Sequence, residues 1–102
     1  MKHILILLFS VSLIINGFGQ TAEEYYDSGL LKAQGDNYLG AIADFDNAID
    51  LNSNYADAYY LRGISKASLE DYRSAIADYT KVIEIEPENV DAYFSRGLAK
   101  NV

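Results

Sequence analysis

The stretch Asp-Ala-Tyr-Tyr-Leu-Arg-Gly at residues 57–63 returns 34 positions later as Asp-Ala-Tyr-Phe-Ser-Arg-Gly at residues 91–97. A weaker copy, Glu-Glu-Tyr-Tyr-Asp-Ser-Gly, stands 34 residues earlier at residues 23–29. A fixed period of this length is typical of a repeat array, in which each unit is one supersecondary element that cannot bury its apolar face alone. From about residue 20 onward, the sequence therefore predicts two such units and the start of a third.

Apolar residues around these copies recur every three or four positions, which is the spacing of one helix face. This pattern predicts helices at residues 22–34, 38–51, 56–68 and 72–85, and a fifth from residue 90 through Leu98. Thr21 and Glu24 are spaced as a capping box at the start of the first helix. Pro87 follows the fourth helix, where its fixed φ and missing N–H stop helix propagation.

The recurring residues hold fixed places when Ala22, Ala56 and Val90 are counted as first positions. The fourth position is aromatic, the eighth glycine, the twentieth alanine and the twenty-fourth aromatic, and the second unit has proline at the thirty-second. These residues are Tyr25, Tyr59 and Tyr93; Gly29, Gly63 and Gly97; Ala41 and Ala75; Phe45 and Tyr79; and Pro87. Small residues let the two helices of one hairpin approach closely, and the aromatic rings fill the space between neighbouring hairpins.

This pattern resembles the tetratricopeptide repeat, in the Arg-Gly version common in bacterial proteins, and the resemblance covers residues 22–102. It implies an all-α fold, a right-handed superhelical array of antiparallel helix hairpins (an α-solenoid) with about 2.5 repeats and five helices. Repeat one would be residues 22–55, repeat two 56–89, and a partial repeat three 90–102. The chain departs from the family pattern at the seventh position (Ser28, Arg62, Arg96), the eleventh (Lys32, Lys66) and the thirty-second (Ser53). The loop glycine also differs, since Gly35 lies one position earlier than is usual in the family.

Residues 1–19 are predicted to be a signal peptide, which leaves residues 20–102 as an exported domain, periplasmic or secreted. A basic start precedes an apolar run at residues 4–15, and the small residues Gly17 and Gly19 favour cleavage before Gln20. The run is shorter than the roughly 20 apolar residues that cross a bilayer. The alternative is an uncleaved signal that holds the chain to the inner membrane.

Composition excludes several classes of chemistry for residues 20–102. His3 is the single histidine, and the chain has no cysteine, so a Ser-His-Asp or Cys-His nucleophile and a zinc site of histidine or thiolate ligands cannot be built. The formal net charge of the whole chain, −7, argues against nucleic acid and anionic membranes as partners, because both attract clustered Lys and Arg. We expect no enzyme activity, no metal, no cofactor and no small-molecule substrate.

The resemblance implies a peptide-binding groove lined by the second, fifth and ninth positions of each unit. Those residues are Glu23, Tyr26 and Leu30; Asp57, Tyr60 and Ile64; and Asp91, Phe94 and Leu98. The groove would be aromatic and aliphatic with an acidic row along one edge, which suits a peptide with apolar anchors and some basic residues. The alternative is that Tyr26, Tyr60 and Phe94 only pack against neighbouring helices. Family members that hold a carboxy-terminal carboxylate use Lys, Arg and Asn at these positions, so the acids here argue against a chaperone-tail clamp.

Two arginines occupy positions otherwise used for packing, and a buried guanidinium needs a carboxylate partner. Asp44 and Asp78 recur with the same period. We therefore predict pairs between repeats, Asp44 with Arg62 and Asp78 with Arg96.

The sequence favours a non-catalytic scaffold in the bacterial envelope or exterior that binds an unknown protein or peptide. One alternative is a structural assembly module that self-associates through the open carboxy-terminal helix. Another is the arm of a larger complex, since the third unit stops after one helix.

Overall fold

The computed structural model describes residues 19–102 and contains five α-helices and no strand in that range. They are α2 (Ala22–Gln34), α3 (Tyr38–Leu51), α4 (Ala56–Ser68), α5 (Tyr72–Ile85) and α6 (Val90–Lys100). The all-α hairpin array predicted from the sequence is confirmed. The predicted signal peptide, apart from Gly19, lies outside the described residues. None of the helices between residues 19 and 102 combines the length and apolar content needed to cross a membrane.

Local sequence explains where most helices begin, because the N-cap side chains accept a backbone N–H that has no partner inside the helix. Thr21 Oγ1 accepts from the Glu24 N–H at 3.1 Å, and the Thr21 hydroxyl also donates to the Glu24 carboxylate at 3.4 Å. Asn37 and Asn89 cap α3 and α6 in the same way at 3.0 Å, and Asp71 caps α5 at 3.4 Å. The N-cap of α4 is Tyr55, which makes no side-chain cap.

The turns inside the two hairpins have a left-handed residue that is not glycine. Asp36 and Glu70 both have φ of 64°, whereas Gly35, the residue before Asp36, is the C-cap of α2 with φ of −91°. A left-handed conformation places Cβ close to the backbone in every residue except glycine. In the first turn Gly35 lies one residue before the left-handed position, and the second turn contains no glycine. An acidic residue therefore takes the strained conformation in both turns.

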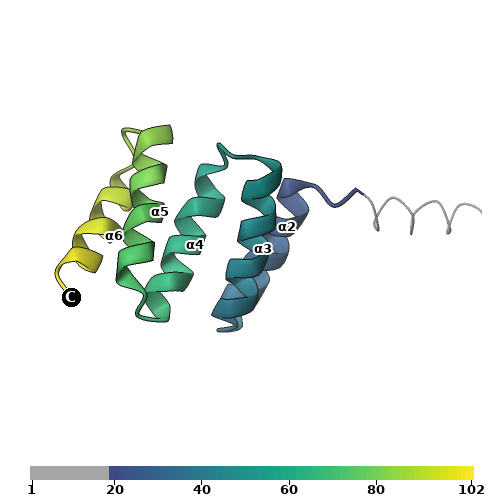
Figure 1. Cartoon of the computed structure of the whole chain (residues 1–102), viewed down its shortest axis with the longest axis horizontal. Coiled ribbons are helices and arrows are strands. Elements are labelled where there is room, and N and C mark those ends of the chain that lie inside the picture. Colours follow the sequence, from purple (N-terminus) through teal and green to yellow (C-terminus); the bar gives the residue numbers. More distant parts are fainter. Residues whose placement is uncertain (1–18) are drawn as a thin grey trace, which may run out of the picture.

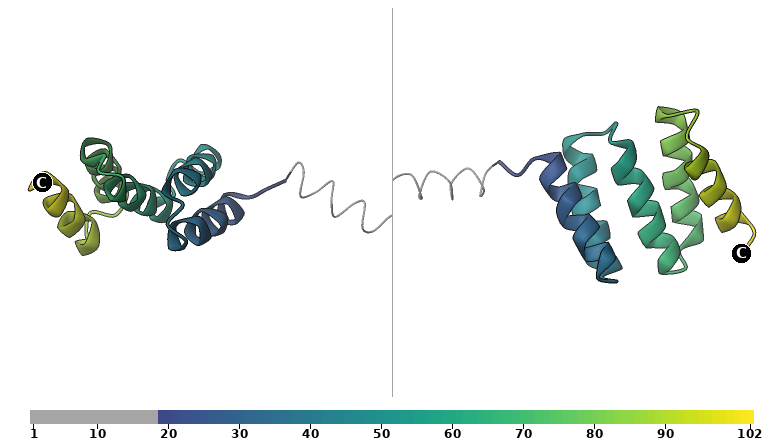
Figure 2. Two further views of the ribbon diagram at one scale, coloured as in Figure 1. Left: turned by 90° about the horizontal axis from the view of Figure 1, so that it is seen from below. Right: turned by 180° about the vertical axis from the view of Figure 1, so that it is seen from behind.

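The helices stand side by side in one row, with α2 and α3 at one end and α6 at the other (Figure 1). Each helix packs against the next one along the chain, and α4 also contacts both α2 and α6. Figure 2 shows the same row from below and from behind. The first helices of the three units therefore share one side of the array, which is the side where the sequence predicts a groove.

The small and aromatic residues of the repeat pattern form the core. Phe45 and Tyr79 are 0% and 1% exposed, and their rings lie against Gly29 and Gly63 of the preceding helix. A Cβ at Gly29 would stand 2.6 Å from the Phe45 ring, and one at Gly63 would stand 2.7 Å from the Tyr79 ring. Glycine at the eighth position is thus required because the aromatic ring of the same repeat occupies the space of a side chain.

Candidate functional site

One end of the predicted groove is an aromatic cluster on α2 and the turn before α4. Tyr26 stacks on Tyr55 with ring centroids 5.2 Å apart, and it also meets Phe45 at 5.9 Å. Tyr26 and Tyr55 both remain partly exposed. Sequence reasoning missed Tyr55, because it lies outside the groove positions of the repeat and only the turn from α3 to α4 brings its ring beside Tyr26.

Three carboxylates surround this tyrosine pair. Burial, followed by the charges of Asp57 and Asp27, raises the pKa of the Tyr26 hydroxyl above its ordinary value. Burial also raises the pKa of Tyr55, with further contributions from Glu23, Tyr26, Asp27 and Asp57. The side chains of Glu23, Asp27 and Asp57 are exposed. The surface around the pair therefore combines ring area with negative potential, which attracts a cationic side chain.

The middle of the groove is more closed. Tyr60 of α4 packs on Tyr79 of α5 with ring centroids 5.9 Å apart, and its hydroxyl shares a 3.0 Å hydrogen bond with Ser95 of α6. Tyr60 therefore joins the second and third units. Tyr26 and Tyr60 each pack against a ring of the next helix, and both remain partly exposed.

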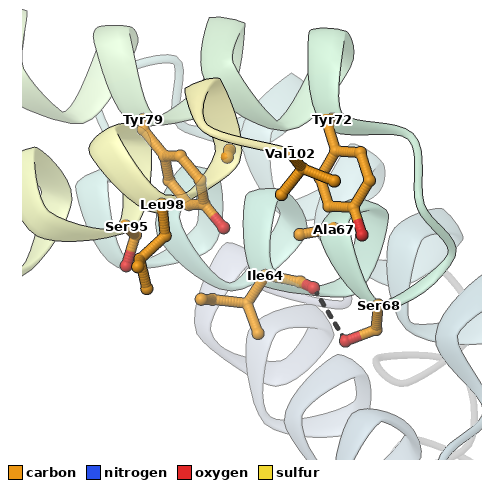
Figure 3. A pocket seen from close by; sticks show the side chains of 9 residues that line it. Ile64, Ala67, Ser68, Tyr72, Tyr79, Ser95, Leu98 and Val102 are labelled. Atoms are coloured by element: carbon orange, nitrogen blue, oxygen red, sulfur yellow. Dashed lines mark hydrogen bonds between the residues drawn. The ribbon is translucent and has the colours of Figure 1, made fainter.

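The other end of the groove is an apolar hollow of about 280 Å³ between α4, α5 and α6 (Figure 3). Ile64 and Ala67 reach it from α4, and Leu98 and Val102 reach it from α6 and the residues that follow. Tyr72, Tyr79, Ser68, Ser95 and Ala99 complete its lining. The side chain of Leu98 is 55% exposed and that of Val102 is 79% exposed, so the hollow is open to solvent.

The structure brings the nine predicted groove residues together only in part. Ile64 and Leu98 line the same hollow, while Leu30 is half-buried on α2 at the far end of the array. Phe94 projects from α6 and is 66% exposed, because the described chain has no helix beyond α6 to cover it. The acidic residues Glu23, Asp57 and Asp91 are all exposed near the first turns of their helices.

The predicted pairs Asp44 with Arg62 and Asp78 with Arg96 are wrong, because both arginines have other partners. Arg62 donates to both oxygens of Asp78, at 2.7 and 3.0 Å, and to Asp46 at 2.8 Å. Arg96 donates to the Thr80 hydroxyl at 3.3 Å rather than pairing with Asp78. The physical reason is that the seventh position of a repeat faces the second helix of its own hairpin, so Arg62 meets the aspartate of its own unit. Burial lowers the pKa of Arg62, but hydrogen bonds to Asp78 and then Asp46 outweigh burial and raise it overall.

The two recurring aspartates have a second recurring partner. Lys32 pairs with Asp44 at 2.9 Å in the first hairpin, and Lys66 pairs with Asp78 at 3.0 Å in the second. Ser28 also donates to Asp44 at 2.7 Å, from the position that Arg62 holds in the next unit. The lysines that replace the usual aromatic residue at the eleventh position are thus one half of an ion pair inside each hairpin. This pairing satisfies a carboxylate that is 9% exposed in Asp44 and 3% exposed in Asp78.

The described site combines apolar, aromatic and acidic side chains. Within residues 19–102 no group of three or more Asp, Glu, His or Cys side chains is arranged to hold a metal ion. The groove offers two exposed tyrosine edges, an acidic surface and an apolar hollow. Such features are typical of surfaces that recognise a partner by shape and charge.

Comparison with known proteins gives consistent results. Residues 56–89 match the family model described as Tetratricopeptide repeat. No curated protein sequence matches the chain significantly. Among solved structures, a crystal structure of MamA is 41% identical with a TM-score of 0.78 and covers 79% of this chain. The present chain spans about half of the MamA chain, 47% of its length.

Two further solved structures share the fold. The second TPR domain of human RPAP3, solved in complex with an HSP70 peptide, is 26% identical with a TM-score of 0.79, covering 84% of this chain and 72% of that one. The Arabidopsis OM64 TPR domain is 23% identical with a TM-score of 0.80, covering 85% and 72%. Residues 56–89 thus match the tetratricopeptide repeat model, and the hairpins of residues 19–102 have the fold of solved TPR domains.

Proposed function

We propose that residues 20–102 are a non-catalytic scaffold that binds a peptide segment of another protein along the side formed by α2, α4 and α6. The observation that carries this proposal is the apolar hollow lined by Ile64 and Leu98, which is open to solvent at one end of the groove. The human RPAP3 domain, at 26% identity, has been solved with a bound peptide. That precedent supports a peptide as the type of ligand.

The apolar half of the site selects the anchor. A hollow of about 280 Å³ accommodates one branched aliphatic or aromatic side chain and would bury the exposed surfaces of Leu98 and Val102 as it fills. Burying a side chain of this size contributes about 1.5–3 kcal/mol. The ligand is therefore expected to place one large apolar residue against α4 and α6.

The acidic half selects the flanking charge. Glu23, Asp27 and Asp57 surround the stacked Tyr26 and Tyr55 rings. A lysine or arginine placed here would contact both a ring face and a carboxylate. An acidic ligand would instead meet like charges. The HSP70 peptide bound by the RPAP3 domain ends in Glu-Glu-Val-Asp, so we propose the opposite charge preference for the present chain.

Binding of two charge-reversed peptides tests this function. The peptides share one leucine-rich core and carry either lysines or glutamates on the same side, and fluorescence anisotropy measures their affinity for residues 20–102. The lysine peptide is expected to bind about tenfold more tightly at low salt, and this difference should shrink at high salt because the acids are exposed. Equal affinities, or tighter binding of the glutamate peptide or the HSP70 peptide, would contradict the proposal.

Two protein variants locate the site. Leu98→Ser removes apolar surface from the hollow and is expected to weaken both peptides about equally. Leu39→Ser is the matched control, since Leu39 is also exposed, at 73%, but lies on α3 away from the hollow. If Leu39→Ser weakened binding as much as Leu98→Ser, the hollow would not be the binding site.

We also propose that the chain acts outside the cytoplasm, because residues 1–19 have the composition of a signal peptide. Expression of residues 1–102 in a Gram-negative host, followed by mass spectrometry of the periplasmic fraction, tests this. A chain that begins at Gln20 is expected. Full-length protein in the membrane fraction would support an uncleaved signal, and full-length protein in the cytoplasm would overturn the proposal.

A further inference from the structure

We propose that the hollow between α4, α5 and α6 selects a tyrosine side chain as the anchor of the bound peptide, and that the Tyr79 hydroxyl recognises the phenol of that anchor. This inference rests on the peptide-binding function proposed above and names the residue that the ligand places in the hollow. Tyr79 is then a specificity-determining residue, because it distinguishes a tyrosine anchor from phenylalanine or leucine.

The first argument is the state of the Tyr79 hydroxyl. Tyr79 is 1% exposed and lines the hollow from α5. Within residues 19–102, the tyrosine hydroxyls that have a hydrogen-bond partner are those of Tyr38, Tyr59 and Tyr60, so the Tyr79 hydroxyl has none. Polar groups on side chains buried this deeply are normally hydrogen-bonded. The unpartnered hydroxyl is therefore a feature that the packing of the fold does not explain.

The second argument is that this hydroxyl faces the hollow. Among residues 19–102, Ser65 Oγ is the one side-chain oxygen or nitrogen that is both fully enclosed and without a partner. The Tyr79 hydroxyl also lacks a partner, so it must retain access to solvent, and the hollow is the opening that Tyr79 lines. Figure 3 shows its hydroxyl pointing toward the side of the hollow where Ile64 and Leu98 lie.

An entirely apolar anchor would leave the Tyr79 hydroxyl without any partner. While the hollow is open, solvent can hydrogen-bond to the hydroxyl. A leucine or phenylalanine side chain that fills the hollow displaces this solvent and offers no polar atom in exchange. Leaving a buried donor unsatisfied offsets much of the affinity gained by burying the anchor. A site that can hydrogen-bond a ligand hydroxyl therefore rejects the analogue that lacks it.

A tyrosine side chain matches the lining of the hollow. The rings of Tyr72 and Tyr79 and the aliphatic side chains of Ile64 and Leu98 require an anchor with an apolar body. The Tyr79 hydroxyl requires one polar group on that body, and a phenol combines a ring with a single hydroxyl. The methionine sulfur is only a weak acceptor, and the carboxamide of glutamine brings two further donor hydrogens that an apolar wall leaves unpaired.

The two serines of the hollow are already hydrogen-bonded. The Ser68 hydroxyl donates to the Ile64 carbonyl at 3.0 Å, and Ser95 Oγ shares a 3.0 Å hydrogen bond with the Tyr60 hydroxyl. Burial raises the pKa of Tyr79 to about 12, so at neutral pH its hydroxyl is protonated and can donate to the phenol oxygen or accept from it. Tyr79 is therefore better placed than either serine to bind the anchor.

Phenylalanine is compatible with the position of Tyr79, which makes a conservative variant available. Phe45 holds the equivalent position in the first hairpin and is 0% exposed. The ring is thus sufficient for packing, and the hydroxyl is an addition of the second hairpin. Tyr79→Phe is expected to fold like the parent at neutral pH, and circular dichroism checks this.

Two peptides that differ in one oxygen atom test the inference. Both carry the flanking lysines described above and a single large side chain, either tyrosine or phenylalanine, among alanines. Fluorescence anisotropy measures their affinities for the parent protein at neutral pH. The tyrosine peptide is expected to bind at least about fivefold more tightly than the phenylalanine peptide.

Protein variants assign this preference to one hydroxyl. In Tyr79→Phe the tyrosine peptide should weaken at least about fivefold, while the phenylalanine peptide binds as before or more tightly, so that the preference disappears. Tyr25→Phe is the matched control, because Tyr25 is a half-buried tyrosine on α2 that does not line the hollow. Tyr72→Phe removes the other tyrosine hydroxyl of the lining. Both of these variants should keep the preference of the parent.

Leu98→Ser separates this inference from the peptide-binding function, because it should weaken both peptides alike. If it does so and the parent binds the two peptides equally, the function stands and the tyrosine anchor is wrong. If neither peptide binds the parent, or if Leu98→Ser leaves both affinities unchanged, the hollow is not the site and both proposals fail. A preference that survives in Tyr79→Phe, or that is lost only in Tyr72→Phe, would also overturn the inference, since another group would then recognise the phenol.

Discussion

At the scale of single residues, one buried side-chain oxygen among residues 19–102 has no hydrogen-bond partner. Ser65 is 0% exposed on α4, and within the described structure its hydroxyl has no hydrogen-bond partner. The equivalent position in the third unit is Ala99, which packs in the core without a polar atom. A buried hydroxyl without a partner lowers stability because it loses its hydrogen bonds to water on folding.

Ser65→Ala is therefore expected to raise the free energy of unfolding by about 1 kcal/mol. Chemical denaturation in urea measures the change. Ser68→Ala is the matched control on the same helix, since the Ser68 hydroxyl is exposed and donates to the Ile64 carbonyl at 3.0 Å. A Ser65→Ala protein no more stable than the parent would mean that water satisfies the hydroxyl in solution.

Tyr79 gives the chain a pH-dependent stability at alkaline pH. Burial is the main cause that raises the pKa of its hydroxyl from 10.0 to about 12, with smaller contributions from Tyr60 and Asp78. Because the folded pKa is above the unfolded one, the folded state holds this proton more tightly. The resulting stability is present in full below pH 10 and is lost as the pH rises from 10 towards 12.

Tyr79→Phe is expected to remove this contribution. The parent should lose stability between pH 10 and 12 more steeply than the variant, as measured by urea denaturation across that range. Ultraviolet absorbance of tyrosinate gives a second measurement, because the component that titrates near pH 12 should disappear in the variant. An unchanged alkaline titration would show that Tyr79 is not the group responsible.

At the scale of helices and turns, the arginine of the second hairpin connects three elements. Arg62 on α4 reaches Asp78 on α5 and Asp46 on α3, so one guanidinium joins a hairpin internally and also links it to the preceding unit. Asp78 is 5% exposed at its side chain while Asp46 is 50% exposed. The bond to Asp78 therefore dominates, since solvent weakens the bond to Asp46.

The left-handed turn residues give an element-scale prediction. Glu70 has φ of 64° in the turn between α4 and α5, so Glu70→Gly should relieve backbone strain and raise the free energy of unfolding by about 0.5–1 kcal/mol. Glu88→Gly is the control, because Glu88 is an exposed loop glutamate without a positive φ. That control should be neutral or slightly destabilising. Thermal denaturation of both variants distinguishes strain relief from the loss of one negative charge.

At the scale of the whole molecule, stability depends on each unit being covered by the next. Helix α6 covers Val82 and packs Ala92 and Ala99 against the second hairpin, where Val82 and Ala92 are 0% exposed. It also supplies Ser95 to the Tyr60 hydroxyl. The stability of such an array is approximately the sum of its repeats and the interfaces between them.

A chain that ends at residue 89 should therefore be markedly less stable than one that ends at residue 102. Exposing the flank of α5 is expected to cost about 3 kcal/mol, which corresponds to a fall of roughly 10–20 °C in the melting temperature for a domain of this size. A chain that ends at residue 100 is the control, since it retains α6. Equal melting temperatures for all three chains would show that the second hairpin does not need α6.

The sequence by itself determined the period, the five helices and the core. The 34-residue spacing, the small residues at the eighth and twentieth positions and the aromatic residues at the twenty-fourth are local patterns, and the helix bounds follow from capping residues that act within one turn. Of the predicted site, the sequence alone places Ile64 and Leu98 in equivalent positions of neighbouring repeats.

Only the tertiary structure decided which polar groups meet. The sequence shows that aspartates and arginines recur, and Asp44 and Asp78 hold the same repeat position. Sequence therefore cannot tell which of the two Arg62 faces, because that depends on how the helices pack. The sequence also did not predict the contact of Tyr55 with Tyr26. That contact depends on the direction of the turn between α3 and α4. Tertiary structure also showed that Gly97, which holds the same repeat position as Gly29 and Gly63, has no neighbouring atom within 4 Å of where its Cβ would be. The period could not predict this, because it shows which residue recurs and not what packs against it.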